Sequence, residues 1–322
     1  MLTTPLLVLL AERHGPVDVV TTPGAAPLLE THPAVRRVIA YDKRRTDRGP
    51  AGLWRLSQRL RAEGYGIAYL PHRSLRSAAL AWLARIPRRV GFHDGWPLLY
   101  TGTRVRPRSG HEIDRLLALG DAPPSHQAAP TLAPSLADRQ SAESLMRTGG
   151  IARPFVTIAP GSIWGTKRWG GYADLAARLA PGTAVVAVGG PEDTPLGEAI
   201  VAAALKAGGK AVNACGRLSL RGAAALIGQS AVLVTNDSAP LHFAQASGTP
   251  TVAIFGPTVP TFGFGPRGPR DVVVEHADLA CRPCSPHGPR VCPLGHHRCM
   301  VDIGVERVLH AIEETGALRH RD

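Results

Sequence analysis

Two segments of the sequence carry side chains of the kinds that bind phosphorylated ligands. Residues 160–169 read Pro-Gly-Ser-Ile-Trp-Gly-Thr-Lys-Arg-Trp, and residues 236–242 read Asn-Asp-Ser-Ala-Pro-Leu-His. Glycines let the backbone approach a ligand closely, hydroxyls donate hydrogen bonds, and a lysine supplies a compact charge suited to a diphosphate. The candidate ligand-binding residues in these two segments are Ser162, Thr166, Lys167, Asp237, Ser238, Ala239 and His242.

The elements around these segments predict that both lie at the same edge of one sheet. Each follows an apolar run, at residues 155–159 and 231–234, and precedes a helical pattern. A turn between a parallel strand and a helix presents backbone N–H groups and the helix dipole, which favour a phosphate. We therefore expect the two loops together to bind a nucleotide diphosphate. The simpler alternatives are an exposed basic loop and a helix cap made by Asp237 or Ser238.

Two acidic residues have separate expected roles. Asp237 is unsuited to bind phosphate itself, so we expect it to orient a lysine or to bind sugar hydroxyls. Glu192, with Asp193 beside it, follows the apolar run 184–188 and a Gly-Gly-Pro turn. That place suits a carboxylate that accepts hydrogen bonds from a ribose.

The chain of 322 residues has the length of two domains. Strand and helix patterns alternate in both halves, which predicts an α/β fold with parallel sheets covered on both faces. The segment 121–153 is rich in Pro, Ala and Ser and is the expected connection. The predicted divisions are a first domain at 1–150, a second at 151–304, and a last helix at 305–322 that packs back on the first domain.

The first half contains four predicted strands and an irregular basic loop at residues 93–110. The predicted strands there are 17–21, 35–41, 66–70 and 89–92, and the predicted helices are 25–30, 50–63, 74–84 and 111–119. Residues 1–10 are apolar and read as a further helix. No apolar run approaches the roughly 20 residues of a membrane span, and no signal peptide is visible, so the cytoplasm is the expected location.

The basic residues are unevenly distributed. The chain carries 37 Lys and Arg against 25 Asp and Glu, a net charge of +12. Residues 1–150 hold 21 basic and 12 acidic side chains, and residues 151–322 hold 16 and 13. A basic first half favours an anionic partner, such as a phosphorylated glycolipid, a membrane surface or nucleic acid. The alternative is a solvated arginine-rich surface.

Four of the five cysteines are clustered, with two, seven and six residues between them. This spacing predicts a structural zinc or iron site, in which His296 or His297 could replace one thiolate. Two disulfides or unligated thiols are the alternatives. The fifth, Cys215, is expected to be a buried apolar side chain. The predicted metal ligands are Cys281, Cys284, Cys292 and Cys299.

The two loops, followed by Gly256-Pro257-Thr258, resemble glycosyltransferase family 9, the heptosyltransferases of lipopolysaccharide inner-core synthesis. The similarity covers nearly the whole chain and is strongest over residues 155–305. It implies a GT-B fold, in which two Rossmann-like domains with parallel sheets face a central cleft. It also implies inverting transfer of a heptose, or a related sugar, from an ADP-activated donor without a catalytic metal.

The resemblance also implies roles for individual residues and partners. Lys167 and Asp237 would be catalytic. Ser162, Thr166 and Lys167 would contact the donor diphosphate, and the ADP-sugar site would be lined by Asp237, Ser238, Ala239 and His242. The acceptor would be an anionic glycolipid, the lipopolysaccharide inner core, placed against the basic first domain. The enzyme would contact the inner face of the cytoplasmic membrane peripherally.

The sequence departs from the family at its start. Members begin with an apolar strand and a turn ending in Gly-Asp, whose Asp is the expected general base for the acceptor hydroxyl. Here Met1 already lies in the helix that follows, so that Asp is expected upstream of Met1, and the first strand of the first domain is missing. We favour a truncated start over an impaired enzyme. Asp18 and Asp42 are candidate substitutes, although the context of neither supports the role.

Three other functions remain open at this point. A GT-B-like nucleotide-sugar epimerase would need acidic residues on both sides of the sugar, and only Asp237 is found. A basic metal-finger protein that binds nucleic acid would carry its charge near the cysteines and interleave aromatic with basic residues, and neither is seen. A degenerate family member would bind the donor without transfer. We expect no nucleic-acid partner.

Overall fold

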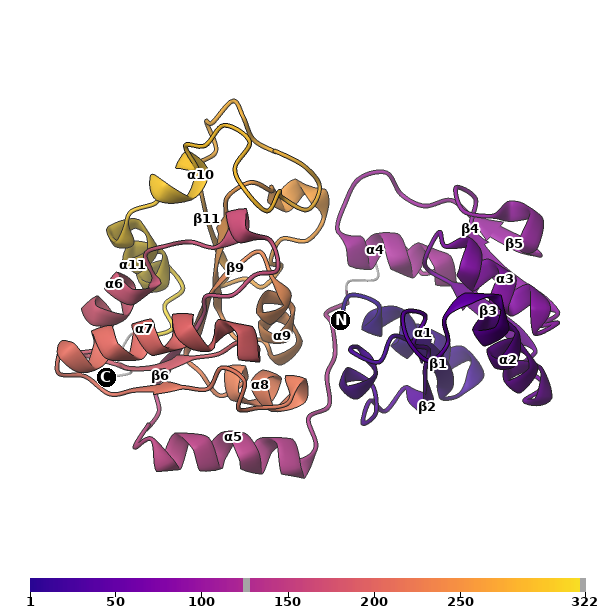
Figure 1. Ribbon diagram of the computed structural model, residues 1–322, viewed down its shortest axis with the longest axis horizontal. Helices are drawn as coiled ribbons and strands as arrows, with labels where there is room; N and C mark the ends of the chain where they lie inside the picture. Colours follow the sequence, from indigo (N-terminus) through magenta and orange to yellow (C-terminus); the bar gives the residue numbers. More distant parts are fainter. Residues whose placement is uncertain (124–127, 319–322) are drawn as a thin grey trace. The chain divides into compact units, whose positions relative to one another are not determined.

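The computed structural model describes residues 1–123 and 128–318 of the chain. It divides into two compact units, Met1–Ala133 and Pro134–Asp322, and each unit has its own parallel strands and covering helices (Figure 1). The sequence predicted a division at residue 150, so the observed boundary lies earlier. Residues 319–322 of the predicted last helix lie outside the described residues.

The described residues of the first unit form two separate parallel sheets rather than one. One pairs β1 with β2, and the other has the order β3-β4-β5. The third strand of the second sheet, β5, lies inside the basic segment that the sequence predicted to be irregular. The elements are α1 (Thr4–His14), β1 (Val17–Thr21), β2 (Val35–Ala40), α2 (Gly49–Ala62), β3 (Ile67–Leu70), α3 (Leu75–Leu83), β4 (Arg88–Phe92), β5 (Gly102–Arg104) and α4 (Glu112–Leu117).

Several apolar clusters hold the first unit together. Leu6, Leu9 and Leu10 of α1 pack with Phe92 of β4 and with α4. A second cluster joins α2 and α3 to the strands, and it contains Leu56, Leu60, Leu70, Ala78 and Leu80. The apolar start of the sequence is therefore the buried helix α1, as predicted. The segment predicted as a helix at 25–30 forms only a short 3-10 turn, Ala26–Leu28.

The second unit is built on one six-stranded parallel sheet with the order β11-β10-β9-β6-β7-β8. Its elements are α5 (Leu136–Thr148), β6 (Phe155–Ala159), α6 (Tyr172–Leu179), β7 (Ala184–Ala187), α7 (Thr194–Lys206), β8 (Ala211–Asn213), α8 (Leu220–Ile227), β9 (Val232–Asn236), α9 (Ala239–Ser247), β10 (Thr251–Phe255), β11 (Val272–Glu275), α10 (Arg298–Val301) and α11 (Val305–Glu314). Helices α6, α7 and α11 cover one face, and α5, α8 and α9 cover the other (Figure 1).

Successive side chains of β6 enter opposite layers, because strand residues alternate between the two faces of a sheet. Phe155 packs among residues of α5 and α8, whereas Val156 packs among residues of α6 and α11. All five residues of β6 are buried. This continuous apolar run is the pattern expected of a central parallel strand.

Helix α5 belongs to the second unit, which explains why the boundary precedes it. Ala142, Leu145 and Met146 of α5 are buried in one cluster with residues of the sheet and of α8. Asp138 of α5 also pairs with Arg221 of α8, with 2.8 Å between Oδ2 and Nε. The last helix, α11, likewise packs on β10, β11 and α6 of the second unit. Within the described residues, no helix has both the length and the hydropathy needed to cross a membrane.

Candidate functional site

The candidate loops meet where the strand order of the second unit reverses. From β6 the chain continues through β7 to β8 on one side, and then returns to β9, on the other side of β6. Ala159 at the end of β6 lies opposite Thr235 near the end of β9. The crevice outside the carboxyl ends at such a switch point is where open α/β sheets bind ligands. The prediction that both loops lie at one edge of one sheet is confirmed.

An ion pair joins the two loops. Lys167 Nζ lies 2.5 Å from Asp237 Oδ2, and the exposed fractions of the two side chains are 10% and 11%. Thr258, in the loop after β10, donates a hydrogen bond from Oγ1 to the same carboxylate oxygen at 2.7 Å. The structure therefore brings Asp237 into contact with Lys167. The arrangement presents one cation, fixed by a carboxylate, at the carboxyl edge of the sheet.

Asn236 fixes the first loop to the end of β9. Its Oδ1 accepts hydrogen bonds from the backbone N–H of Trp169 at 3.1 Å and from the Tyr172 hydroxyl at 2.9 Å. Its Nδ2 donates to the Pro160 carbonyl at 2.9 Å. Asn236 is fully buried, so these bonds satisfy polar groups that water cannot reach. The sequence showed Asn236 within the motif but did not reveal this structural role.

The start of α9 does not depend on a side-chain cap. Ser238 occupies the N-cap position, yet its side chain makes no capping hydrogen bond. Its Oγ lies 3.3 Å from Thr235 Oγ1 instead. Capping therefore does not explain the polar residues of this loop. Ala239 is exposed at the first helical position.

His242 lies one turn into α9. Its Nδ1 lies 2.9 Å from Gln245 Oε1. Because the amide oxygen can only accept, Nδ1 carries the proton of this bond. Burial lowers the pKa of His242, an effect that Gln245 and Asp237 partly offset. The ring is therefore neutral at neutral pH.

The remaining predicted donor residues occupy different environments. Ser162 Oγ accepts a hydrogen bond from the backbone N–H of Trp164 at 3.2 Å. Thr166 is buried and donates its hydroxyl proton to the Pro289 carbonyl, so this hydroxyl is already engaged. Glu192 is exposed, whereas Asp193 beside it is buried.

Asp193 packs against the glycine of the first loop. A Cβ atom at Gly161 would lie 2.2 Å from Asp193 Oδ2. That oxygen accepts the backbone N–H of Gly190 at 3.0 Å, and Oδ1 has no hydrogen-bond partner among the described residues. Burial raises the pKa of Asp193. Only a glycine at position 161 allows this close approach.

The cysteine-rich segment, residues 276–299, packs on the first loop. His297 Nε2 lies 2.8 Å from the Thr166 carbonyl oxygen, and the His287 ring stacks on Trp164 with 6.3 Å between ring centroids. Because a carbonyl only accepts, His297 carries its proton on Nε2, the nitrogen that faces Thr166. His296 Nδ1 accepts the backbone N–H of Arg298 at 3.0 Å.

The five cysteines, all within the described residues, are free thiols. Cys215 is buried, as predicted, and burial raises its pKa to about 12. Burial also raises the pKa of Cys299, to about 11, whereas backbone N–H groups, that of His297 foremost, lower the pKa of Cys292. Among the described residues, no three His, Cys, Asp or Glu side chains are arranged so that they could hold a metal ion.

Both candidate substitutes for the general base are engaged in hydrogen bonds. Asp18 accepts hydrogen bonds from Arg36, Arg37 and Tyr65. The Arg36 guanidinium, above all, lowers the pKa of Asp18 to about 2, which makes it a weak base. Asp42 Oδ1 accepts backbone N–H groups of its own turn, from Arg44 and Arg45.

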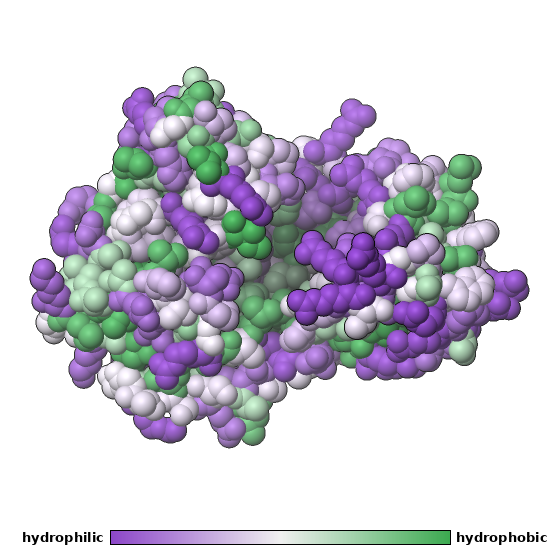
Figure 2. Space-filling view, viewed as in Figure 1, coloured by the Kyte–Doolittle hydropathy of each residue, from purple (hydrophilic) through white to green (hydrophobic). Residues whose placement is uncertain are grey.

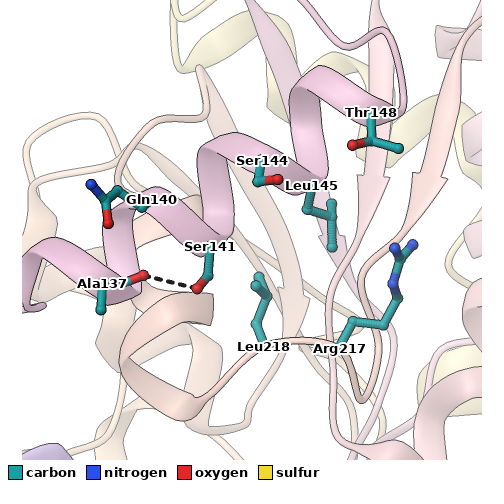
Figure 3. Close-up of a pocket in the computed structure, with 8 residues that line it drawn as sticks. All are labelled: Ala137, Gln140, Ser141, Ser144, Leu145, Thr148, Arg217 and Leu218. Carbon is teal, nitrogen blue, oxygen red and sulfur yellow. Dashed lines mark hydrogen bonds between the residues drawn. The ribbon is translucent and has the colours of Figure 1, made fainter.

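A separate cavity of about 480 Å³ lies beside α5 (Figure 3). Residues of α5 line one wall, and Arg217 and Leu218, which precede α8, line the other. Ser141, in the wall that α5 forms, donates its hydroxyl proton to the Ala137 carbonyl at 2.8 Å. None of the predicted donor residues contributes to this cavity.

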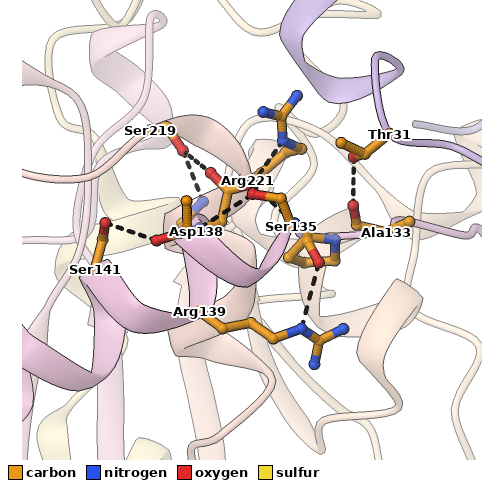
Figure 4. Close-up of polar contacts among 11 residues, drawn as sticks. Thr31, Ala133, Ser135, Asp138, Arg139, Ser141, Ser219 and Arg221 are labelled. Carbon is orange, nitrogen blue, oxygen red and sulfur yellow. Dashed lines mark hydrogen bonds and ion pairs between the residues drawn. The ribbon is translucent and has the colours of Figure 1, made fainter.

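A buried ion pair lies near this cavity (Figure 4). Asp138 accepts hydrogen bonds from Ser135, Ser219 and Arg221, and the Asp138 side chain is only 8% exposed. Burial alone would raise the pKa of Asp138, but these hydrogen bonds outweigh it and hold the pKa well below its usual range. The cluster fastens α5 to α8, and its members Ser135, Asp138, Ser219 and Arg221 lie in neither candidate loop.

Comparisons with known proteins agree with this geometry. The model of glycosyltransferase family 9 (heptosyltransferase) matches residues 53–293. The chain is 30% identical to lipooligosaccharide heptosyltransferase 2 of Haemophilus influenzae, over 92% of this chain and 90% of that protein. It is also 30% identical to lipopolysaccharide heptosyltransferase 2 of Salmonella typhimurium, over 76% and 75%.

Solved structures give the same result. The glycosyl transferase family 9 structure from Veillonella parvula superposes with a TM-score of 0.82 at 25% identity, over 98% of this chain and 92% of that one. The E. coli ADP-heptose lipopolysaccharide heptosyltransferase II gives 0.79 at 26% identity, over 98% and 94%. These matches identify a glycosyltransferase with a GT-B-like α/β fold and decide against the epimerase and the metal-finger protein. The chain belongs to glycosyltransferase family 9.

Proposed function

We propose that this protein transfers a heptose, or a related sugar, from an ADP-activated donor to a lipopolysaccharide inner-core acceptor. The observation that carries the proposal is the Lys167–Asp237 pair at the switch point of the second sheet. Relatives of this chain carry the names lipopolysaccharide and lipooligosaccharide heptosyltransferase 2. A further structural neighbour was solved with ADP-2-deoxy-2-fluoro heptose, although at 18% identity it supports only the fold.

The reaction would be an inverting displacement. The acceptor oxygen forms a bond to the anomeric carbon of the sugar, the bond from that carbon to the β-phosphate oxygen breaks, and ADP leaves. The acceptor proton passes to a general base. Negative charge grows on the leaving diphosphate, and a fixed cation beside it lowers the barrier. Lys167 would supply that cation, and Asp237 would orient it.

The other loop residues would complete the donor site. Ser162, Ser238 and backbone N–H groups at the start of α9 would face the phosphates, and Ala239 leaves room for them. Thr166 would act through the Pro289 contact rather than as a phosphate donor, because its hydroxyl proton is engaged. Neutral His242 would bind by hydrogen bonding rather than by charge. Glu192, exposed to solvent, would accept the ribose hydroxyls.

The acceptor would bind against the first unit. That part of the chain holds most of the excess positive charge, and hydrophilic side chains are prominent on its face in Figure 2. Phosphorylated glycolipids and anionic membrane surfaces are attracted to such surfaces. We therefore place the enzyme in the cytoplasm, in peripheral contact with the inner face of the cytoplasmic membrane.

The cysteine cluster would hold a structural zinc or iron ion. This assignment is supported by the spacing of Cys281, Cys284, Cys292 and Cys299. The described geometry does not assemble these thiols into a coordinating group. We assign the ion no part in the transfer reaction.

Calorimetric titration with ADP, UDP and GDP tests the donor site first. We expect ADP to bind more tightly than the other two nucleotides. Release of ADP from ADP-heptose, dependent on an inner-core acceptor, then tests the transfer. Tighter binding of UDP or GDP would contradict the donor assignment, and an absence of binding by all three would contradict the whole site.

A further inference from the structure

One carboxylate oxygen of Asp237 accepts two hydrogen bonds. Lys167 Nζ lies 2.5 Å from Oδ2, and Thr258 Oγ1 donates to the same atom at 2.7 Å. Asp237 follows β9 and Thr258 follows the neighbouring strand β10, so this hydrogen bond joins two adjacent loops. A hydrogen bond to a charged group is stronger than one between neutral groups, and here it limits the rotation of the carboxylate.

Thr258 is itself fixed by a buried arginine. Thr258 is 1% exposed, and its carbonyl oxygen accepts a hydrogen bond from Arg282 Nη2 at 2.9 Å. The Arg282 side chain is 2% exposed and also pairs with Glu275 Oε2 at 2.7 Å. A guanidinium can serve several acceptors at once. Its other acceptors are the carbonyl oxygens of Phe255, Gly256 and His276.

Arg282 belongs to the cysteine-rich segment, residues 276–299. The backbone N–H of Cys284 donates to the Pro257 carbonyl at 2.9 Å, which adds a second bond between this segment and the loop that carries Thr258. The same segment reaches the first loop, where His297 bonds the Thr166 carbonyl. The segment therefore contacts Thr258, which bonds Asp237, and Thr166, which precedes Lys167.

We propose that Thr258 is a positioning residue of the donor site and that Arg282 holds it in place. The Thr258 hydroxyl fixes the carboxylate of Asp237, and the carboxylate keeps the Lys167 ammonium turned toward the donor diphosphate. Without the hydroxyl, Asp237 rotates and carries Lys167 with it. This inference rests on the proposed function, because it applies only if Lys167 contacts the donor.

Two substitutions at one position test the role of the hydroxyl. Thr258→Val keeps the shape of the side chain and removes its donor, whereas Thr258→Ser keeps the donor. We expect Thr258→Val to raise the Kd for ADP about tenfold, the effect of one hydrogen bond to a charged group. We expect Thr258→Ser to stay within about twofold of the unsubstituted protein, which a role in packing alone would not predict.

The matched control is Thr251→Val at the other end of β10. Thr251 is fully buried, and its Oγ1 donates to the Thr249 carbonyl at 3.0 Å, remote from the Asp237 carboxylate. We expect it to lower the Tm as Thr258→Val does while the Kd for ADP stays unchanged. Arg282→Lys serves as a second probe, and we expect it to raise the Kd because one amine cannot replace the fork of the guanidinium.

Three results would overturn the inference. An unchanged Kd in Thr258→Val would overturn it alone and leave the proposed donor site intact. An equal rise of the Kd in Thr258→Val and Thr251→Val would show that the loss of affinity comes from a general loss of stability. Failure of the unsubstituted protein to bind ADP would overturn both this inference and the proposed function.

Discussion

Lys167 Nζ and Asp237 Oδ2 lie 2.5 Å apart, although the two residues are 70 positions apart in the sequence. Both side chains are largely withdrawn from water. A buried ion pair is costly to break from one side, because the remaining charge is left without its partner. An anionic ligand that approaches Lys167 meets a cation already fixed in place, so little reorganisation is needed on binding.

Lys167→Met should therefore weaken ADP binding by about 1.5–3 kcal/mol, the range for hydrogen bonds to charged groups. Calorimetric titration measures the change. Lys206→Met is the matched control, since Lys206 is exposed at the end of α7. Thermal unfolding of both variants separates a loss of ligand contacts from the stability lost when Asp237 stays unpaired. Equal affinities in the two variants would remove Lys167 from the site.

Gly161→Ala should disturb the first loop, because the new Cβ would lie 2.2 Å from the Asp193 carboxylate. Overpacking of this kind costs about 1–3 kcal/mol of folding free energy. We also expect weaker ADP binding, since the loop must move. Gly170→Ala, directly after this loop, is the control, because a Cβ there meets no atom within 4 Å. Denaturant unfolding of the two variants compares them, and identical stabilities would contradict the contact.

Asp138→Asn should lower the free energy of unfolding by about 3 kcal/mol, since it removes a charge from a buried pair. Figure 4 shows this carboxylate with its donors Ser135, just before α5, and Ser219 and Arg221, at the start of α8. The affinity for ADP should not change, because Asp138 and its partners Ser135, Ser219 and Arg221 lie in neither candidate loop. Asp174→Asn on the exposed side of α6 should alter neither quantity. A stable Asp138→Asn protein would show that the pair contributes little.

The pH dependence of stability should depend in part on Asp18. The pKa of Asp18 is about 2 in the folded state, held down chiefly by Arg36, against an ordinary 3.8. The ionised carboxylate therefore stabilises the folded state above about pH 4, and this contribution is lost as the pH falls toward 2. Denaturant unfolding of the unsubstituted protein and Asp18→Asn between pH 7 and 2 should show a difference that shrinks with acidity. A difference independent of pH would contradict this account.

Metal analysis tests the cysteine cluster. If it holds a structural ion, the purified protein should contain close to one zinc or iron per chain, and Cys292→Ser should lower that content and the stability. Cys215→Ala is the control, because Cys215 is buried apart from the cluster. Metal-free protein of unchanged stability would refute the site.

Much of the second unit could be predicted from its sequence. The apolar run 155–159 and the helical pattern at 172–179 have the bounds of β6 and α6, because local hydrophobicity and turn residues determine them. The position of both loops at one sheet edge also followed, since parallel strands end on the same side. These features could be predicted because each is determined by residues that are close together in the sequence.

Other features could not be predicted, because they depend on contacts between distant residues. Thr258 gave no local sign that it bonds Asp237, and Asp138 gave none that it pairs with Arg221. The strand β5 was missed because Gly102–Arg104 is only three residues long and lacks an apolar run. This short segment forms a strand because it pairs with β4.

The attachment of α5 to the second unit has a consequence for dissecting this enzyme. A fragment that starts near Pro134 would retain the helix that shields Phe155, Val186 and Leu226, together with the partner of Arg221. A fragment that starts at residue 151 would uncover that apolar layer and invite aggregation. Helix α5 is thus an integral part of the second unit, and gene fusions or domain exchanges should be cut before it.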